Sequence, residues 1–150
     1  MLILSDSNRQ LLRERMEKEL VSDVKVTLFT KRESPIIIPG RECVACRETG
    51  ELLEEITSLS DKLHLEVHDF YEEREEAAKL NINRIPAFLL EGEARGKVRY
   101  FGIPAGHEFP SFVDDVIEVS KGSTSLSDSS LESLKALTRD VHIQVFVTPT

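Results

Sequence analysis

The sequence predicts an α/β fold of three layers, in which helices cover both faces of a mixed central sheet. One observation is that strand-like and helix-like patterns take turns between Val24 and Ile117. Another is their order, which is strand, helix, strand, helix, strand, strand, helix. This order is a βαβ unit followed by a ββα unit. A crossover through a helix makes the first two strands parallel, with a right-handed connection.

Two helices and two strands are expected in the N-terminal half. The first helix follows capping residues at 5–7, and its apolar side chains recur at helical spacing: Leu11, Leu12, Met16 and Leu20. The first strand covers 24–29, where valine and leucine alternate with polar residues. A loop over 31–42, interrupted by prolines, leads to a helical pattern from Cys43. Its apolar face consists of Leu52, Leu53, Ile56 and Leu59. In the second strand, three apolar residues alternate with three polar ones, which indicates one buried face: Leu63, Leu65 and Val67 against His64, Glu66 and His68.

The C-terminal half continues with a short acidic helix over 72–80 and an apolar strand over 85–90, which opens with a proline. A turn over 91–96 and a returning strand over 98–101 complete a hairpin. Apolar residues at offsets of three and four then predict a further helix: Phe109, Phe112, Val113, Val116 and Ile117. After a linker of small residues, the pattern indicates one more helix and a strand: Leu131, Leu134 and Leu137, then Val141–Val147.

The charge balance excludes several classes of partner. The chain has 19 basic and 27 acidic residues, a net charge of −8. An acidic surface repels phosphate backbones and anionic lipid, so we expect neither nucleic acid nor membrane as a partner. No uncharged apolar run approaches the length that spans a membrane, and Met1–Leu4 is too short for a signal peptide. We therefore expect a cytoplasmic protein. A charged fraction of 31% with few cysteines favours a thermophilic source, where cytosolic disulfides are tolerated.

An internal repeat divides the chain. The tetrapeptide at 4–7 recurs at 126–129, and the segment 23–29 is echoed at 140–146. Both matches keep the order of helix followed by strand, which indicates a duplication rather than a C-terminal helix and strand of independent origin. We expect one unit with an N-terminal helix at 1–122. Residues 123–150 are expected to be the helix and strand that begin a truncated second unit.

The two cysteines, Cys43 and Cys46, are the candidate catalytic residues. A loop this short constrains the unfolded chain too little for the pair to act as a structural staple, so reactivity is the better explanation. At the start of a helix, free N–H groups and the helix dipole stabilise a thiolate; Arg41 and Arg47 add positive charge, and Glu42 opposes it. A pKa of about 7 or below is expected for Cys43, the nucleophile. Cys46 is the thiol that resolves the mixed disulfide.

A proline strand begins about forty residues further on. In the pair Ile85 and Pro86, a cis peptide bond is available at modest cost and would place a backbone edge beside the sulfurs. We therefore expect these two residues to bind substrate. An ordinary trans proline at the start of a strand is the alternative.

These motifs together resemble a known family. The order strand, Cys-x-x-Cys helix, strand, helix, Ile-Pro strand, hairpin and helix is similar to that of thioredoxin and glutaredoxin. The segments Val98–Phe109 and Val145–Thr150 resemble the glutaredoxin-like protein disulfide oxidoreductases of thermophilic archaea and bacteria, which contain two fused thioredoxin-fold units. The resemblance implies a thioredoxin-like fold and disulfide exchange with protein substrates. It also implies an upstream reductase and no cofactor.

Three features depart from that family. The second Cys-x-x-Cys pair, expected directly after Thr150, is absent. Valine and alanine separate the cysteines without the proline common in glutaredoxin-like motifs, so no redox potential can be assigned. Residues 33–40 form an insertion with Ile36, Ile37 and Ile38, either an apolar platform or lid for substrate or a part of the core. The strand at 24–29 also lacks the buried acid of thioredoxins, so no general base is named.

Two alternatives from other classes remain. Cys43, Cys46, His64 and His68 have the spacing Cys-x2-Cys-x17-His-x3-His, which is close to a zinc-finger pattern, and His64, Glu66 and His68 form a second candidate ligand set. The histidines lie on a strand rather than on the helix that a finger uses. The other alternative is a non-catalytic scaffold with the same fold. An unpaired strand at 141–147 would then support a homo-oligomer by edge pairing.

Overall fold

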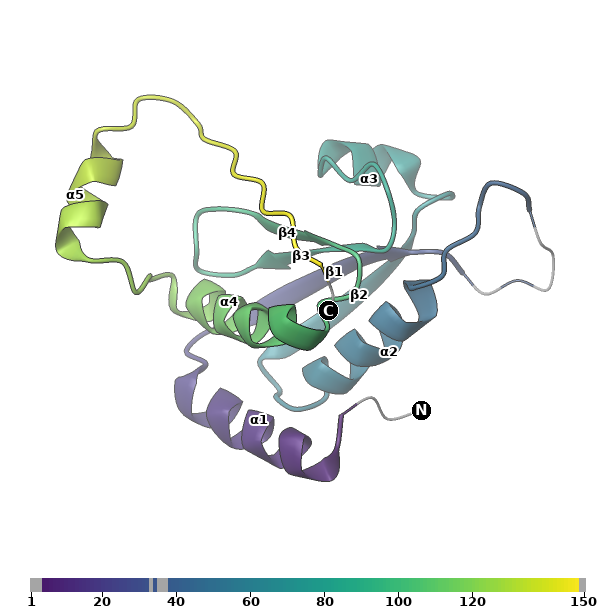
Figure 1. Ribbon diagram of the computed structural model, residues 1–150, viewed down its shortest axis with the longest axis horizontal. Helices are drawn as coiled ribbons and strands as arrows, with labels where there is room; N and C mark the ends of the chain where they lie inside the picture. Colours follow the sequence, from purple (N-terminus) through teal and green to yellow (C-terminus); the bar gives the residue numbers. More distant parts are fainter. Residues whose placement is uncertain (1–3, 33, 35–37, 149–150) are drawn as a thin grey trace.

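The computed structural model describes residues 4–32, 34 and 38–148. Its regular elements follow the predicted order (Figure 1). The helices are α1 (Asp6–Glu19), α2 (Cys46–Thr57), α3 (Arg74–Lys79), α4 (Phe109–Lys121) and α5 (Asp128–Lys135), with a 3-10 turn η1 (Gly106–Glu108) before α4. The strands are β1 (Val24–Thr30), β2 (Leu63–Asp69), β3 (Ala87–Glu91) and β4 (Val98–Phe101).

The four strands form one mixed sheet in the order β2-β1-β3-β4. β1 and β2 are parallel, from Val24 opposite Leu63 to Thr30 opposite Asp69. β3 runs antiparallel to both β1 and β4. The parallel pair with α2 between its strands is the predicted βαβ unit, and β3 and β4 form the predicted hairpin.

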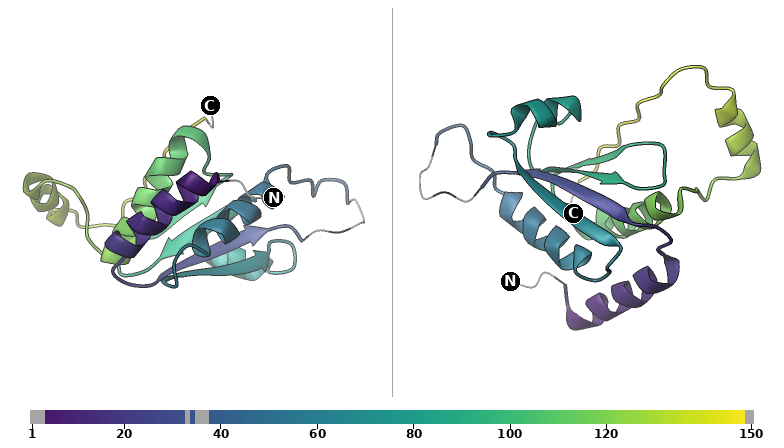
Figure 2. Two further views of the ribbon diagram at one scale, coloured as in Figure 1. Left: turned by 90° about the horizontal axis from the view of Figure 1, so that it is seen from below. Right: turned by 180° about the vertical axis from the view of Figure 1, so that it is seen from behind.

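Helices cover both faces of this sheet, as predicted (Figure 2). Ala77 of α3 packs against Phe29 on one face. The main core cluster lies on the other face and receives fully buried side chains from three helices: Met16 from α1, Leu53 from α2 and Phe112 from α4. The three-layer α/β architecture is therefore confirmed. No helix in the described part of the chain is both long enough and apolar enough to cross a membrane.

Ser120 fastens α4 to the segment before β1. Its side chain is buried, and its Oγ accepts hydrogen bonds from the N–H groups of Val21 and Ser22, both at 2.9 Å. The same hydroxyl donates to the carbonyl oxygen of Ser22 at 2.7 Å. One buried hydroxyl thus satisfies three backbone groups in the turn between α1 and β1.

Two apolar positions differ from the prediction. Leu11 is 62% exposed, because α1 turns Met16 rather than Leu11 towards the core. Val67, which was expected on the buried face of β2, is 53% exposed. β2 is an edge strand, and the core cluster includes Leu63 and Leu65 but ends before Val67.

The predicted strand Val141–Val147 is wrong for this structure. The helix before it, α5, is present, but residues 139–148 lie outside the four-stranded sheet, and their side chains are exposed. A strand needs a hydrogen-bonded neighbour, and alternation in sequence does not supply one. The assignment of 123–150 to a second unit stays a prediction.

Candidate active site

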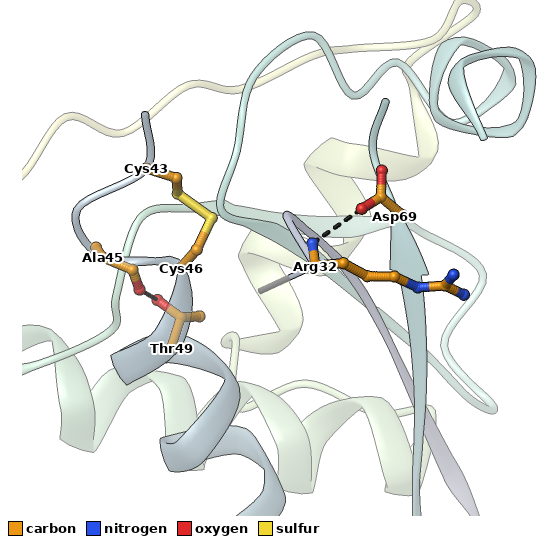
Figure 3. Close-up of a disulfide and its surroundings, with 6 residues drawn as sticks. All are labelled: Arg32, Cys43, Ala45, Cys46, Thr49 and Asp69. Carbon is orange, nitrogen blue, oxygen red and sulfur yellow. Dashed lines mark hydrogen bonds between the residues drawn. A yellow bond between two sulfur atoms is a disulfide. The ribbon is translucent and has the colours of Figure 1, made fainter. Parts of the chain in front are cut away.

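Cys43 and Cys46 form a disulfide, with their Cα atoms 5.4 Å apart (Figure 3). Their environments differ. Cys46 is the first residue of α2 and only 5% exposed, whereas Cys43 precedes the helix and is half-buried. Between them, Val44 is 97% exposed. The bond is therefore accessible from the Cys43 side, where a sulfur of another molecule can approach.

The sequence pattern predicts a helix from Cys43, but in the structure α2 begins at Cys46. Ala45 is the N-cap residue and supplies no side-chain acceptor. The carbonyl oxygen of Ala45 accepts from the N–H of Thr49 at 2.9 Å and from its hydroxyl at 2.7 Å (Figure 3). Within the described residues, the N-cap of α2 makes no side-chain hydrogen bond, and the N–H groups of the first turn point towards the end of the helix where Cys43 lies.

Asp69 joins the loop after β1 to the loop after β2. It is 7% exposed; its Oδ2 accepts from the N–H of Arg32 at 2.9 Å (Figure 3). Its Oδ1 accepts from the N–H groups of Tyr71 at 2.8 Å and Glu72 at 3.0 Å. Burial raises the pKa of Asp69, but these backbone donors outweigh burial, so its pKa lies below the ordinary 3.8. Since its oxygens already accept backbone donors, Asp69 is a structural acceptor and not the missing general base.

Aromatic rings hold arginines near the same loops. The guanidinium of Arg41, two residues before Cys43, lies 4.5 Å from the ring centroid of Tyr71. Arg74 lies over the same ring at 5.5 Å. Arg47, on the other side of the cysteine pair, is exposed and lies 3.8 Å from Glu51. Of the two arginines that the sequence placed beside the cysteines, one is therefore stacked and one faces a carboxylate.

Ile85 and Pro86 lie at the same end of the sheet as the cysteine loop. Phe29, near the end of β1, is opposite Ala87, the first residue of β3. The peptide bond before Pro86 is cis, as expected. Pro86 is buried and its carbonyl oxygen accepts from the N–H of Gly102 at 2.8 Å, while Ile85 is half-buried.

The zinc alternative finds no assembled ligand set. Nε2 of His64 lies 3.5 Å from Asp23, while His68 contacts Glu66 and Glu73 and stacks on Phe29. The two cysteines are bonded to each other. Among the residues that the structure describes, no three histidine, cysteine or acidic side chains are grouped to hold a metal ion.

The 33–40 insertion is described only in part. Ile36 and Ile37 lie outside the described residues, and Ile38 is exposed. In β1, the one buried polar side chain is Thr27, whose hydroxyl is not a general base at neutral pH. The strand thus supplies no acid in place of the one that the sequence lacks.

Sequence reasoning missed Asp69, Tyr71 and Thr49. An aspartate at the end of a strand, two and three residues before the N–H groups it caps, is a recognisable Asx-turn pattern. The contacts of Asp69 with Arg32 and of Tyr71 with Arg41 join residues far apart in the chain, so nothing local indicates them.

The sequence is similar to short parts of much longer proteins. No family model matches the sequence. The alkyl hydroperoxide reductase protein AhpF of Staphylococcus aureus is 31% identical over 106 residues, which are 69% of this chain and 18% of that protein. A protein named NADH dehydrogenase from Bacillus subtilis is 29% identical over 101 residues, 66% of this chain and 17% of that protein. The chain thus spans less than a fifth of the length of these relatives.

Two solved structures are similar over most of the chain. One is a protein disulfide oxidoreductase from Aeropyrum pernix, with a TM-score of 0.74, 27% identity and coverage of 91% of this chain and 56% of that one. The other is the alkylhydroperoxide reductase protein AhpF of Enterococcus faecalis, with a TM-score of 0.72, 25% identity and coverage of 89% and 61%.

Proposed function

We propose that this chain, which belongs with the thioredoxin-fold disulfide oxidoreductases, exchanges disulfides with protein substrates through Cys43 and Cys46. The observation that carries the proposal is the bonded pair at the start of α2, with one sulfur accessible and the other buried. The fold and the relatives support the same chemistry, dithiol–disulfide exchange.

The reduced enzyme starts the exchange at Cys43. Its thiolate attacks one sulfur of a substrate disulfide, forms a mixed disulfide and releases the other substrate sulfur as a thiolate. The Cys46 thiolate then attacks the sulfur of Cys43 and releases the second substrate thiolate. The substrate gains two electrons, and the enzyme is left with the Cys43–Cys46 disulfide, which is the state in the structure. Oxidation of a substrate dithiol is the same sequence reversed.

The surroundings of Cys43 support its role as nucleophile. The uncapped N–H groups at the start of α2 favour a negative charge on its sulfur, which lowers its pKa. Ile85 and Pro86 are the proposed substrate-binding residues, because they lie at the same end of the sheet as the cysteine loop.

An upstream reductase returns the Cys43–Cys46 disulfide to the dithiol. The compartment is the cytoplasm, and the source is thermophilic.

Residues 123–150 begin a second thioredoxin-like unit under this proposal, as the internal repeat suggests. In this chain the exposed segment 141–147 carries five exposed apolar side chains: Val141, Ile143, Val145, Phe146 and Val147. Two copies of the chain associate through this segment.

Reduction of insulin disulfides by dithiothreitol tests the function. We expect wild type to accelerate the reaction, and Cys43→Ser to fall to the uncatalysed rate, because no attacking thiolate remains at the accessible position. Ser111→Ala, at an exposed position on α4, is the control and should match wild type. Equal rates for wild type and Cys43→Ser would refute the proposal and favour a non-catalytic scaffold.

A further inference from the structure

Three arginines at one end of the sheet are stacked on aromatic rings. Arg41 and Arg74 lie over Tyr71, and Arg84 lies over Phe101 at 4.6 Å from the ring centroid. Within the described part of the chain, none of the three pairs with a carboxylate. Other arginines do so, each with its own acidic partner: Arg9 with Glu55, Arg15 with Asp114 and Arg32 with Glu72.

The strand register brings these stacks to the end of the sheet that carries the disulfide loop. Arg41 lies in the loop that leads from β1 to Cys43. Tyr71 and Arg74 follow Asp69, which is opposite the last residue of β1. Phe101 at the end of β4 is opposite Ala87, so the Arg84 stack lies beside the start of β3. The stacks therefore come from three loops around the Cys43–Cys46 bond and Pro86.

A guanidinium that lies over an aromatic ring is preorganised to bind an anion. Its face is occupied by the ring, but the N–H groups at its edge remain available for a carboxylate in the guanidinium plane. The stack also restricts the side chain before a partner arrives, which lowers the entropy cost of binding. Arg74 and Arg84 are exposed, and Arg41 is half-buried.

Three carboxylates at this end of the sheet already have partners within the protein. Glu42 accepts from the N–H of Gly40 at 3.0 Å, Glu72 pairs with Arg32, and Glu73 contacts His68. The protein as a whole carries a net charge of −8, which repels acidic partners on average, so arginines without a carboxylate partner are where such a partner would be attracted.

We propose that Arg41, Arg74 and Arg84 bind carboxylates of the protein substrate, so that the enzyme prefers disulfides flanked by aspartate or glutamate. The inference rests on the proposed function and names its substrate class. The arginines act on substrate capture, and the exchange itself remains with the two cysteines.

Peptides with one disulfide and matched flanks test the preference. Three peptides carry glutamate, glutamine or lysine beside the cystine, and kcat/KM for their reduction is measured at about 20 mM and about 500 mM salt. At low salt we expect the glutamate peptide to exceed the glutamine peptide about tenfold or more, and the lysine peptide to be slowest. High salt should remove most of the difference, because it screens the charges.

A triple variant assigns the effect to the three arginines. Arg41→Gln with Arg74→Gln and Arg84→Gln should bring the rate for the glutamate peptide down to the rate for the glutamine peptide. The readout is the ratio of the two rates, because Arg41 also adds positive charge near Cys43 and its loss slows both peptides alike. The control makes the same charge change at exposed positions away from this end of the sheet: Arg13→Gln, Arg95→Gln and Arg139→Gln. This control should keep the preference.

The outcomes separate this proposal from the function on which it rests. Equal rates for the three peptides with wild type would overturn the arginine proposal alone. An equal loss of the glutamate preference in both triple variants would do the same. Failure of wild type to reduce any of the peptides would overturn the proposed function, and the arginine proposal with it. The comparison of peptides and salt uses wild type only, so it holds even if a variant is unstable.

Discussion

The two cysteines share a bond but have different surroundings. Cys46 begins α2 and belongs to the buried residues, whereas Cys43 is half-buried and the neighbouring Val44 is exposed. Thiol–disulfide exchange requires a line of approach to the sulfur that is attacked. Cys43 is the more exposed of the two, which supports the proposed roles of Cys43 as nucleophile and Cys46 as resolving thiol.

Ile85 offers a test of substrate contact at single-residue scale. It is half-buried beside Pro86, and truncation to alanine removes apolar surface that a substrate would cover. We expect Ile85→Ala to lower kcat/KM for insulin disulfides about fivefold to tenfold, with an unchanged reduction potential. The control Leu11→Ala removes an exposed apolar side chain from α1 and should have no effect. A shifted potential with normal kcat/KM would argue against substrate contact.

The contribution of Asp69 to the free energy of unfolding is expected to depend on pH. Its folded pKa lies below the ordinary 3.8, so its contribution is complete above that value and is lost as the pH falls through the folded pKa. We expect Asp69→Ala to lower the free energy of unfolding by about 2–3 kcal/mol at pH 7, because three backbone donors lose their acceptor. Urea denaturation at pH 7 and pH 3 should give a smaller difference between variant and wild type at pH 3. An equal difference at both values would contradict this.

At the scale of elements, the hydroxyl of Ser120 joins the end of α4 to the turn before β1. Ser120→Ala leaves two N–H groups and one carbonyl of the turn before β1 without their side-chain partner. We expect a loss of about 2–3 kcal/mol in the free energy of unfolding, measured by urea denaturation. Ser111→Ala, exposed on the same helix, should lose less than about 0.5 kcal/mol. A comparable loss in both variants would show that the turn does not depend on this hydroxyl.

The helices and strands show how much of the fold can be predicted from the sequence. β1 and α2 were predicted because burial follows their own residue pattern, from Val24 to Leu28 and from Leu52 to Ile56. Val67 is exposed although the alternation predicts a buried side chain. The reason is that β2 is an edge strand, and the core cluster that packs on it ends before Val67. The start of α2 was placed three residues too soon, because helical spacing marks a helix interior better than its cap.

The site was predicted less completely than the fold. The cysteines are three positions apart and Pro86 directly precedes a strand, so both could be recognised from the sequence. Asp69 and Tyr71 act through partners some 30 residues or more away, Arg32 and Arg41, and such contacts arise only when the chain has folded. The stacking of Arg84 on Phe101 also joins separate segments of the chain, whereas Arg74 is only three residues from Tyr71 and that contact was missed although it is local.

At the scale of the molecule, the redox end and the tail are distinct parts. The loops at one end of the sheet carry the disulfide, whereas residues 139–148 run outside the sheet with exposed side chains (Figure 1). A hydrogen bond of 3.5 Å between Arg99 and His142 links this tail to β4. The tail therefore adds little buried area to the folded unit.

Deletion of residues 138–150 tests this separation. Since few contacts are lost, we expect the urea midpoint to stay within about 0.2 M of wild type. Sedimentation should show a smaller associated fraction, because the exposed apolar segment 141–147 is removed. A large fall in the midpoint would mean that the tail is part of the core unit, and unchanged association would place the contact between copies elsewhere.

The pH dependence of thiol alkylation tests the central claim most directly. The reduced protein is treated with iodoacetamide across pH 4–10, and the modified cysteine is identified by mass spectrometry. We predict that Cys43 reacts first, with an apparent pKa of about 7 or below, and that Cys46 is protected. Preferential alkylation of Cys46, or a pKa for Cys43 near the 8.5 or so of a free thiol, would contradict the account.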